Sequence, residues 1–352
     1  MNAPHHTMPE SSSAFPLDRW YVVGFSWELT DKPIARTILG HPLVLFRTAE
    51  KPVALEDRCC HKSLPLSLGT LEEGGLRCGY HGLLFGEDGA CKDIPGQANI
   101  PCEARVHAYE IRERDQILWI WFGSSEHPAS QAEPPGYWVH SDPQYKFRGD
   151  VFHFEAPYQL VHDNLLDLSH LGYVHLRTIG GNARIHAEAE MKVEQEGETI
   201  RVTRYMRDSE PPPTYTAARP FSGNVDRWQE IDFRVTHLLI WAGAVEPGSD
   251  SLSDPNRGGF HIRGFHGVTP ETETSTHYFW TVATNPHPDM QDVTEIVRSQ
   301  SELTFQEDKV VIEAQYRNML RFSGASTVDV HVDVGPNRAR RIIDRLCVKQ
   351  RC

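Results

Sequence analysis

The sequence predicts an α+β protein: a small all-β domain, then a larger domain whose antiparallel sheet wraps on a long C-terminal helix in a helix-grip-like arrangement. Two observations support this. Short strand-like runs separated by turn residues fill the first part of the chain, and alternating strands precede one long helical pattern over residues 292–322 in the second. We therefore expect a disordered segment over 1–15, the first domain over 16–125, a linker over 126–140 and the second domain over 141–352.

Composition narrows the class of protein. The chain has 352 residues and a formal net charge of −13, which argues against nucleic-acid binding. It contains no apolar run long enough to cross a membrane and no signal-peptide pattern at its start, so we expect a cytoplasmic protein. The seven cysteines are an odd number, and those that alternate with histidines suit a metal better than disulfides.

The first domain is expected to be entirely β. Residues 1–15 are polar and low in complexity, which is typical of a disordered segment. Turn residues separate the apolar runs that follow, and a polar stretch containing several prolines starts at residue 124. The expected strands are 20–24, 42–46, 53–56 and 117–123.

The second domain mixes helices and strands. A helical pattern over 156–175 opens it, and the long helix over 292–322 comes near its end, before a short basic amphipathic helix over 337–346. Between the first two helices we expect strands within 189–205, 230–245, 259–269 and 277–285.

Two loops of the first domain each offer one thiolate and one imidazole. Sixteen residues separate Cys59-x-His61 from Cys78-x-x-His81. Zinc binds such a set as a single tetrahedral ion, and a Rieske [2Fe–2S] cluster uses the same two cysteines and two histidines. Glycines such as Gly79 let backbone amides approach the sulfur atoms, which favours the cluster.

A second group of ligand-type residues lies in the segment 163–175, which is otherwise rich in leucine. On a helix, Asp167 and His170 are about 60° apart and share a face. His170 and His175 are about 140° apart, so both point one way only if the helix breaks, and Gly172 is a candidate for that break. Two histidines and a third ligand make the facial triad of non-haem Fe(II) oxygenases.

Together these motifs resemble those of Rieske non-haem iron ring-hydroxylating oxygenases. Cys59-x-His61 with Cys78-Gly-Tyr-His81-Gly resembles their cluster motif, and the segment 164–175 resembles their mononuclear iron motif. The similarity runs from about residue 20 to the C-terminus and is greatest to the oxygenase components of the vanillate and dicamba O-demethylase type. Cys60 is a departure, because relatives usually carry proline there.

The resemblance implies roles for these residues. It assigns Cys59, His61, Cys78 and His81 to the cluster, and His170, His175 and Asp308 to the mononuclear iron. The neighbours of Asp308 at three and four positions are largely apolar, so its carboxylate needs a cation, whereas Glu302 and Glu307 are expected to be solvated.

Two further residues of the segment are catalytic candidates. The resemblance implies that Asp167 links His81 to His170 by hydrogen bonds, in a head-to-tail homotrimer where the cluster of one subunit serves the iron of the next. Asn164 either borders the iron or packs the helix.

The activity implied by the resemblance is oxidative dealkylation of an aromatic compound, either O-demethylation or N-dealkylation. Electrons from NADH arrive through a separate reductase, with or without a ferredoxin, because the chain lacks a Gly-rich dinucleotide fingerprint. The alternatives are a ring dihydroxylase of an aromatic carboxylate, as for phthalate, a Rieske-type electron-transfer protein, and a zinc-stabilised binding protein.

A mostly apolar substrate pocket is expected between the sheet and the long helix. His266 is either its polar anchor or a structural histidine. No Arg or Lys stands among the expected lining residues, which favours a neutral aromatic ether or N-alkyl amide, although Arg219, Arg234 or Arg263 could point inward. The expected lining is Ile240, Trp241, Phe265, His266, Phe279 and Leu303.

Overall fold

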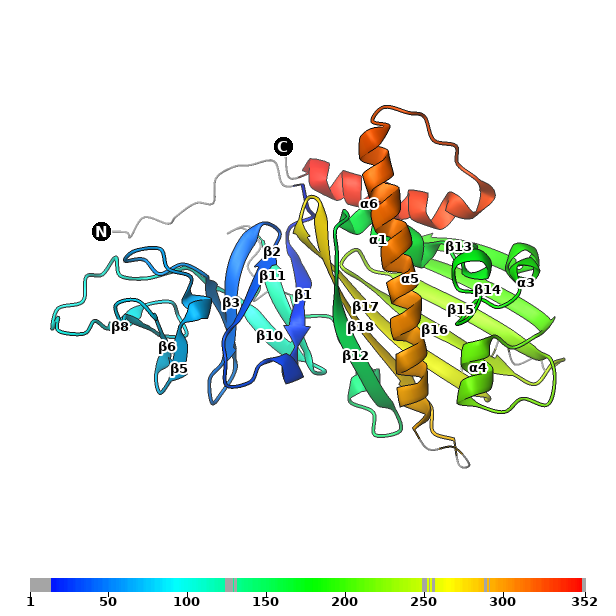
Figure 1. Cartoon of the computed structure of the whole chain (residues 1–352), viewed down its shortest axis with the longest axis horizontal. Helices are drawn as coiled ribbons and strands as arrows, with labels where there is room; N and C mark the ends of the chain where they lie inside the picture. Colours follow the sequence, from blue (N-terminus) through cyan, green and yellow to red (C-terminus); the bar gives the residue numbers. More distant parts are fainter. Residues whose placement is uncertain are drawn as a thin grey trace.

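The computed structural model describes residues 14–123, 129, 132–248, 252, 254, 257–287, 290 and 292–349. The molecule is elongated, with a small β domain at one end and a sheet covered by helices at the other (Figure 1). This confirms the α+β class. Residues 1–13, the last two residues of the expected first domain (124 and 125) and part of the expected linker (126–128, 130 and 131) lie outside the described residues.

The small domain consists of short strands in three antiparallel sheets. Their orders are β1-β11-β10, β2-β3-β4-β9 and β5-β6-β7-β8. The four strands expected from the sequence correspond to β1, β3, β4 and β11. The bounds are β1 (Arg19–Phe25), β2 (Ile34–Ile38), β3 (His41–Arg47), β4 (Pro52–Glu56), β5 (Thr70–Glu72), β6 (Gly75–Arg77), β7 (Leu84–Phe85), β8 (Cys91–Asp93), β9 (Ala108–Tyr109), β10 (Ile111–Arg114) and β11 (Ile117–Phe122).

One antiparallel sheet of seven strands dominates the second domain, in the order β12-β18-β17-β16-β15-β14-β13. Strand β12 was not among the expected strands, because its alternate positions carry charged residues such as Arg148 and Asp150 rather than a continuous apolar pattern. The bounds are β12 (Lys146–Phe154), β13 (Glu190–Glu196), β14 (Thr199–Ser209), β15 (Val225–Phe233), β16 (His237–Val245), β17 (Phe260–Thr272) and β18 (Ser275–Thr284).

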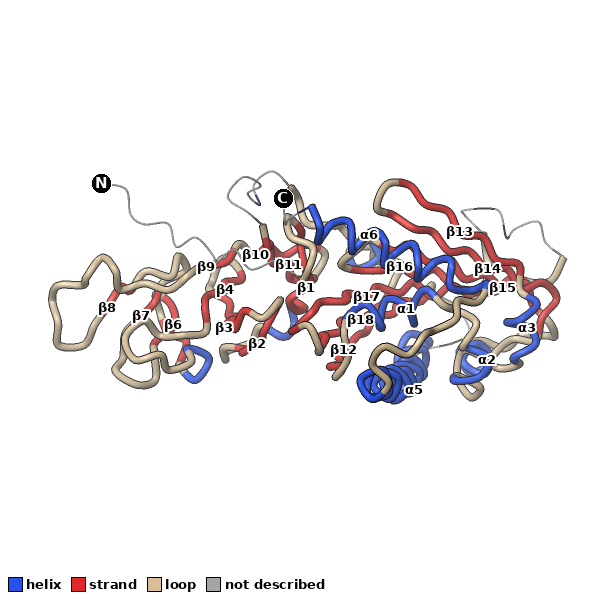
Figure 2. Tube along the Cα trace, turned by 90° about the horizontal axis from the view of Figure 1, so that it is seen from above, coloured by secondary structure: helices blue, strands red, loops and turns tan. Residues whose placement is uncertain are grey.

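Helices cover one face of this sheet. The long helix α5 (Val293–Arg321) packs on β12 and β18, and its bounds match the expected helix over 292–322. In Figure 2 the same helix is seen nearly end-on, on one side of the sheet. The other helices are α1 (Tyr158–Leu166), α2 (Leu171–Val174), α3 (Ala183–Glu188), α4 (Pro213–Ala218) and α6 (Val334–Lys349). No helix in the described part of the chain is both long and apolar enough to span a membrane.

The two faces of the sheet have different neighbours because successive side chains of a strand alternate. Tyr278 and Trp280 of β18 face the helices, where their rings lie 5.3 and 5.0 Å from that of Phe305. Between them, Phe279 faces the small domain, with its ring 6.0 Å from that of Phe25. We call the face under the helices the inner face and the other the outer face.

Candidate metal centres

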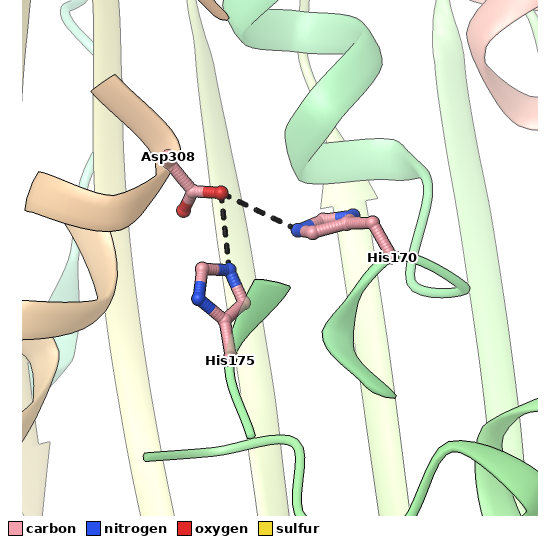
Figure 3. Close-up of side chains that lie close together, drawn as sticks. All are labelled: His170, His175 and Asp308. Atoms are coloured by element: carbon pink, nitrogen blue, oxygen red, sulfur yellow. Dashed lines mark hydrogen bonds and ion pairs between the residues drawn. The ribbon is translucent and has the colours of Figure 1, made fainter. Parts of the chain in front are cut away.

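Three ligand-type side chains converge where α2 and α5 meet over the inner face. His170 and His175 flank the short helix α2, and Asp308 lies in the middle of α5 (Figure 3). Asp308 Oδ1 is 3.0 Å from His175 Nε2 and 3.4 Å from His170 Nε2. The three ligand atoms all lie within 4.8 Å of one another, as the ligands of a single ion do.

An interruption of the helix before His170 allows both histidines to turn inward. The helix expected over 156–175 is in fact two helices, because α1 ends at Leu166 and Asp167 adopts extended backbone angles (φ −94°, ψ 107°). The break is therefore at Asp167 and not at Gly172, which is helical. A Cβ at Gly172 would lie 2.4 Å from Cα of Ala183, so this glycine instead allows α2 to pack closely on α3.

Asp308 is ionised although it is only 5% exposed. Burial alone would raise its pKa, but the hydrogen bonds from His170 and His175 outweigh burial and lower the pKa to about 2. Burial likewise opposes protonation of His175, and its bonds to Asp308 and Glu307 outweigh that and raise its pKa. The site thus holds a fixed negative charge toward which both imidazoles turn.

Two further side chains orient these ligands. Glu307 Oε2 lies 2.8 Å from Nδ1 of His175, which corrects the expectation that Glu307 is only solvated. The sequence feature that indicated a role for Glu307 was its position next to Asp308. Asn164 Nδ2 donates to Asp308 Oδ1 at 2.8 Å and lies 3.5 Å from His170 Nε2, so Asn164 borders the site.

The donor set suits non-haem iron. Two imidazole nitrogens and one carboxylate oxygen form the facial triad typical of Fe(II) oxygenases, which leaves further coordination positions open. The buried charge of Asp308 supplies the countercharge that a divalent cation needs in an apolar environment. Carboxylate contacts to the second imidazole nitrogen, as Glu307 makes, are the usual support of a metal-bound histidine.

The second group lies in loops at the far end of the small domain. Cys59 and Cys78 are buried next to each other, and their thiols interact. His61 and His81 are exposed, with ring centres 4.5 Å apart. Burial raises the pKa of Cys59 to about 11, so it is the incoming metal that displaces the thiol proton.

The arrangement of these four residues bears on the choice between zinc and a cluster. A single tetrahedral zinc ion would bring all four donor atoms close together. Among the described residues, the only group of three or more such donors within 4.8 Å is the His170, His175 and Asp308 site. Cysteines paired with cysteines and histidines with histidines fit the two separate irons of a Rieske cluster.

Asp167 lies beside the iron site but away from the cluster of its own chain. Its Oδ1 accepts hydrogen bonds from the backbone nitrogen (2.7 Å) and hydroxyl (2.6 Å) of Ser169, and its Oδ2 is 3.9 Å from Nδ1 of His170. The sheet β5-β6-β7-β8, next to the cluster loops, lies at the end of the small domain that points away from α5 (Figure 1).

Two of the expected pocket residues lie on the face of the sheet that the helices cover. His266 and Ile240 lie on the inner face. His266 Nδ1 is 2.6 Å from the hydroxyl of Tyr278, and its ring is 5.7 Å from that of Phe305. Burial lowers the pKa of His266 to about 3, so this histidine is neutral at physiological pH.

The other expected lining residues point elsewhere, because adjacent positions of a strand face opposite ways. Trp241 is on the outer face, where the guanidinium of Arg263 lies 3.8 Å from its ring centre and that of Arg257 4.1 Å. Phe265 and Phe279 pack toward the small domain. Leu303 is 55% exposed because it lies on the outward side of α5.

Comparison with known proteins agrees with this geometry. Residues 19–108 match the Rieske [2Fe-2S] domain, and residues 154–349 match the vanillate O-demethylase oxygenase C-terminal domain. The crystal structure of dicamba monooxygenase bound to dicamba superposes with a TM-score of 0.85 at 32% identity, over 95% of this chain and 98% of that one.

Curated relatives cover nearly the whole chain. The vanillate O-demethylase oxygenase subunit of Pseudomonas sp. (strain HR199 / DSM 7063) is 35% identical over 94% of this chain and 95% of its own length. The toluene-4-sulfonate monooxygenase system iron–sulfur subunit of Comamonas testosteroni is 32% identical (93% and 95%). The chloroacetanilide N-alkylformylase oxygenase component of Rhizorhabdus wittichii (strain DC-6 / KACC 16600) is 34% identical (87% and 87%).

The fold and its two metal-binding groups define the oxygenase component of a multicomponent Rieske non-haem iron monooxygenase, with a [2Fe–2S] cluster and a mononuclear iron as cofactors. Within that class, the chain belongs to the vanillate O-demethylase oxygenase family.

Proposed function

We propose that this oxygenase removes an alkyl group from an aromatic ether or N-alkyl amide, with the mononuclear iron held by His170, His175 and Asp308. The observation that carries the proposal is the convergence of two imidazoles on one buried carboxylate oxygen. Relatives whose names specify O-demethylation and N-dealkylation support dealkylation as the reaction.

The chain's own residues prepare the site. Glu307 accepts the Nδ1 proton of His175 and so leaves Nε2 free as a ligand atom. Asn164 donates to Asp308 Oδ1 and holds the carboxylate in one orientation. Buried aromatic residues between the sheet and α5, such as Trp280 of β18 and Phe305 of α5, exclude water from the region beside the triad.

When bound, the cluster supplies electrons one at a time, and the iron supplies the place where O₂ is reduced. Hydroxylation of the carbon attached to oxygen or nitrogen gives a hemiacetal or hemiaminal, which breaks down to an aldehyde and a phenol or amine. One oxygen atom of O₂ enters the aldehyde and the other leaves as water, with two electrons from NADH. A separate reductase, with or without a ferredoxin, delivers these electrons in the cytoplasm.

We infer that electrons pass between copies of the chain in a head-to-tail homotrimer. The exposed histidines of the cluster lie in the small domain, whereas the partly exposed Asp167 lies in the second domain beside the iron site, and a neighbouring copy would join them. The last part of α5 and the loop after it also expose large apolar side chains suited to such an interface. These are Val310, Val311, Met319, Leu320, Phe322, Val328 and Val330.

Replacing Asp308 with alanine tests the iron assignment. We expect Asp308→Ala to yield no aldehyde above background with a surrogate reductase, while the visible spectrum of the cluster is unchanged. Glu302→Ala is the matched control, because Glu302 lies on the same helix and pairs with Arg298 away from the triad. Aldehyde formation at the wild-type rate by Asp308→Ala would refute the assignment.

Replacing Asp167 with asparagine tests the electron route. We expect Asp167→Asn to keep its iron and its cluster but to slow oxidation of the reduced cluster in the presence of substrate and O₂, measured by stopped-flow absorbance. An unchanged rate would exclude Asp167 from the route.

A product screen decides the reaction. Methoxybenzoates and N-alkyl anilides are expected to give formaldehyde or another aldehyde. Conversion of phthalates to cis-diols, with no aldehyde from any substrate, would instead indicate a ring dihydroxylase.

A further inference from the structure

Two arginines lie almost completely buried on the inner face of the sheet. Arg204 of β14 is 2% exposed and Arg227 of β15 is 1% exposed. On their strands they share the inner face with Val202 and Ile231, which belong to the main apolar core. Arg204 stands directly opposite Gln229, which is 6% exposed, in the register of the two strands.

Neither guanidinium group is satisfied by the chain. Arg204 donates from Nη2 to the carbonyl of His186, and Arg227 donates from Nη2 to the carbonyl of Ile179 at 3.3 Å. The guanidinium of Arg227 also lies beside the side chain of Tyr215, 5.3 Å from its ring centre. Within the described residues, Nε and Nη1 of both arginines, as well as Oε1 of Gln229, have no hydrogen-bond partner of good geometry.

The surroundings of another buried arginine, Arg257, which lies before the start of β17, are different. Arg257 is 5% exposed, and its Nη2 lies 2.7 Å from a carboxylate oxygen of Glu230. No described carboxylate forms an ion pair with Arg204 or Arg227. Arginine keeps its proton in proteins, and an unpaired buried charge is strongly destabilising. Two such charges side by side indicate that an anion joins them in the working protein.

The arginine pair lies close to the iron site. Its two hydrogen bonds reach the carbonyls of Ile179 and His186, in the segment that directly follows the iron ligand His175. Burial lowers the pKa of His186 to about 4, and the charges that add to this effect are those of Arg227, Arg204 and the ligand His170. The arginines and the triad therefore share one buried region between the sheet and the helices.

We propose that Arg204 and Arg227, assisted by Gln229, bind the carboxylate or sulfonate group of an anionic aromatic substrate whose alkyl group lies at the iron. The inference rests on the proposed function and names the substrate class. Planar guanidinium groups match the oxygens of these anions, and four unused donor nitrogens are available. The amide of Gln229 is placed beside the same oxygens. This reverses the expectation of a neutral substrate, which rested on the absence of arginine from the expected lining.

The test is direct binding, measured by calorimetry on the anaerobic holoenzyme, so that it does not depend on turnover. The probes are 3- and 4-methoxybenzoate and 4-methoxybenzenesulfonate, each compared with its neutral carboxamide or sulfonamide. We expect at least one anion to bind wild-type protein more tightly than its neutral partner. The carboxylate and sulfonate probes distinguish the two kinds of anion.

The variants are Arg204→Gln and Arg227→Gln. The matched control is Arg201→Gln, since Arg201 lies on the same strand as Arg204 but points outward to Asp232 at 2.6 Å. Each inner variant is expected to weaken the anion about ten- to a hundred-fold and to leave the neutral probe nearly unchanged. Arg204→Lys and Arg227→Lys keep the charge but lose the planar guanidinium group, so their affinity for the anion is expected to lie between those of wild-type protein and the glutamine variants. They replace the glutamine variants where those do not fold.

Two results would overturn the proposal. One is that no anion binds wild-type protein more tightly than its neutral partner. The other is that the variants weaken charged and neutral probes equally, which would mean that the arginines only brace the segment after His175. Selective anion binding without any aldehyde product would instead leave this proposal standing and count against dealkylation.

Discussion

Replacing Glu307 with alanine should loosen the iron without touching any iron ligand. The carboxylate of Glu307 lies 2.8 Å from Nδ1 of His175, whose side chain is 1% exposed. Without that acceptor, the Nδ1 proton is buried and unpaired, and the ring is free to rotate or to change its protonated nitrogen. Loss of such a partner typically costs about 10- to 100-fold in metal affinity or activity.

The structure also ranks a milder variant. The side chain of Glu307 is 36% exposed, so solvent screens much of its charge, and the hydrogen bond matters more than the ionic attraction. Glu307→Gln keeps an oxygen that accepts the Nδ1 proton. We therefore expect Glu307→Gln to lose only about a few-fold in iron affinity, between wild-type protein and Glu307→Ala.

The assay is competition for Fe(II) with a coloured chelator under anaerobic conditions, together with aldehyde formation at saturating iron. Glu302→Gln is the control on the same helix. Equal iron affinity in wild-type protein and Glu307→Ala would refute the view that Glu307 orients His175. So would a greater loss in Glu307→Gln than in Glu307→Ala.

Two further perturbations follow from packing and from protonation. Gly172→Ala places a Cβ 2.4 Å from Cα of Ala183, so we expect the free energy of unfolding to fall by about 1–3 kcal/mol and iron to be retained less well. Gly223→Ala is the control, because its Cβ has open space around it and neither quantity should change. Unaltered urea denaturation of Gly172→Ala would contradict the close packing. Burial lowers the pKa of His237 from 6.5 to about 3. Below pH 6.5 the unfolded chain therefore binds a proton that the folded chain does not bind. As the pH is lowered from 6.5 to 3, the free energy of unfolding decreases by about 1.4 kcal/mol per pH unit. In urea denaturation at pH 7.5, 6.5 and 5.5, His237→Gln should lose less stability on acidification than wild-type protein. The control is His331→Gln, because His331 is exposed. If the free energy of unfolding depends on pH equally in both variants, the lowered pKa of His237 is contradicted.

The ligand-type residues were predictable because their spacing carries the information. Cys59-x-His61 and the pair His170 and His175 occupy loops and a short helix, where neighbours in sequence are neighbours in space. Asp308 was implied by the resemblance, and the apolar positions around it on one helix supported that assignment. In each of these cases the relevant geometry is local to one element.

The lining of the substrate region was not predictable in the same way. Ile240 and Trp241 are adjacent in one strand, so only one of them is able to face the iron, and the sequence does not say which. Which of the two residues faces the helices is set by long-range packing of the small domain on the outer face, for example by the hydrogen bond from Thr269 Oγ1 to the carbonyl of Val22 (2.8 Å). Leu303 and Phe305 differ likewise in which side of α5 meets the sheet.

One signal was present in the sequence and was missed. In β14, Ile200, Val202 and Met206 occupy alternate positions on the inner face, and Arg204 stands in the same set. A charged residue in phase with an apolar series is a candidate for a buried functional group. The expected lining was drawn from β16, β17, β18 and α5, and so did not include this position of β14.

The site is divided between two layers, with α5 and the loops around α2 on one side and the sheet on the other. This division bears on how the substrate specificity of such an enzyme changes. Everything that grips the metal belongs to the helical layer, including the consecutive residues Glu307 and Asp308. The floor beneath it is assembled from separate strands, in which every second side chain faces the triad side. Substitutions on the floor are therefore expected to change which compound fits while leaving the metal ligands in place.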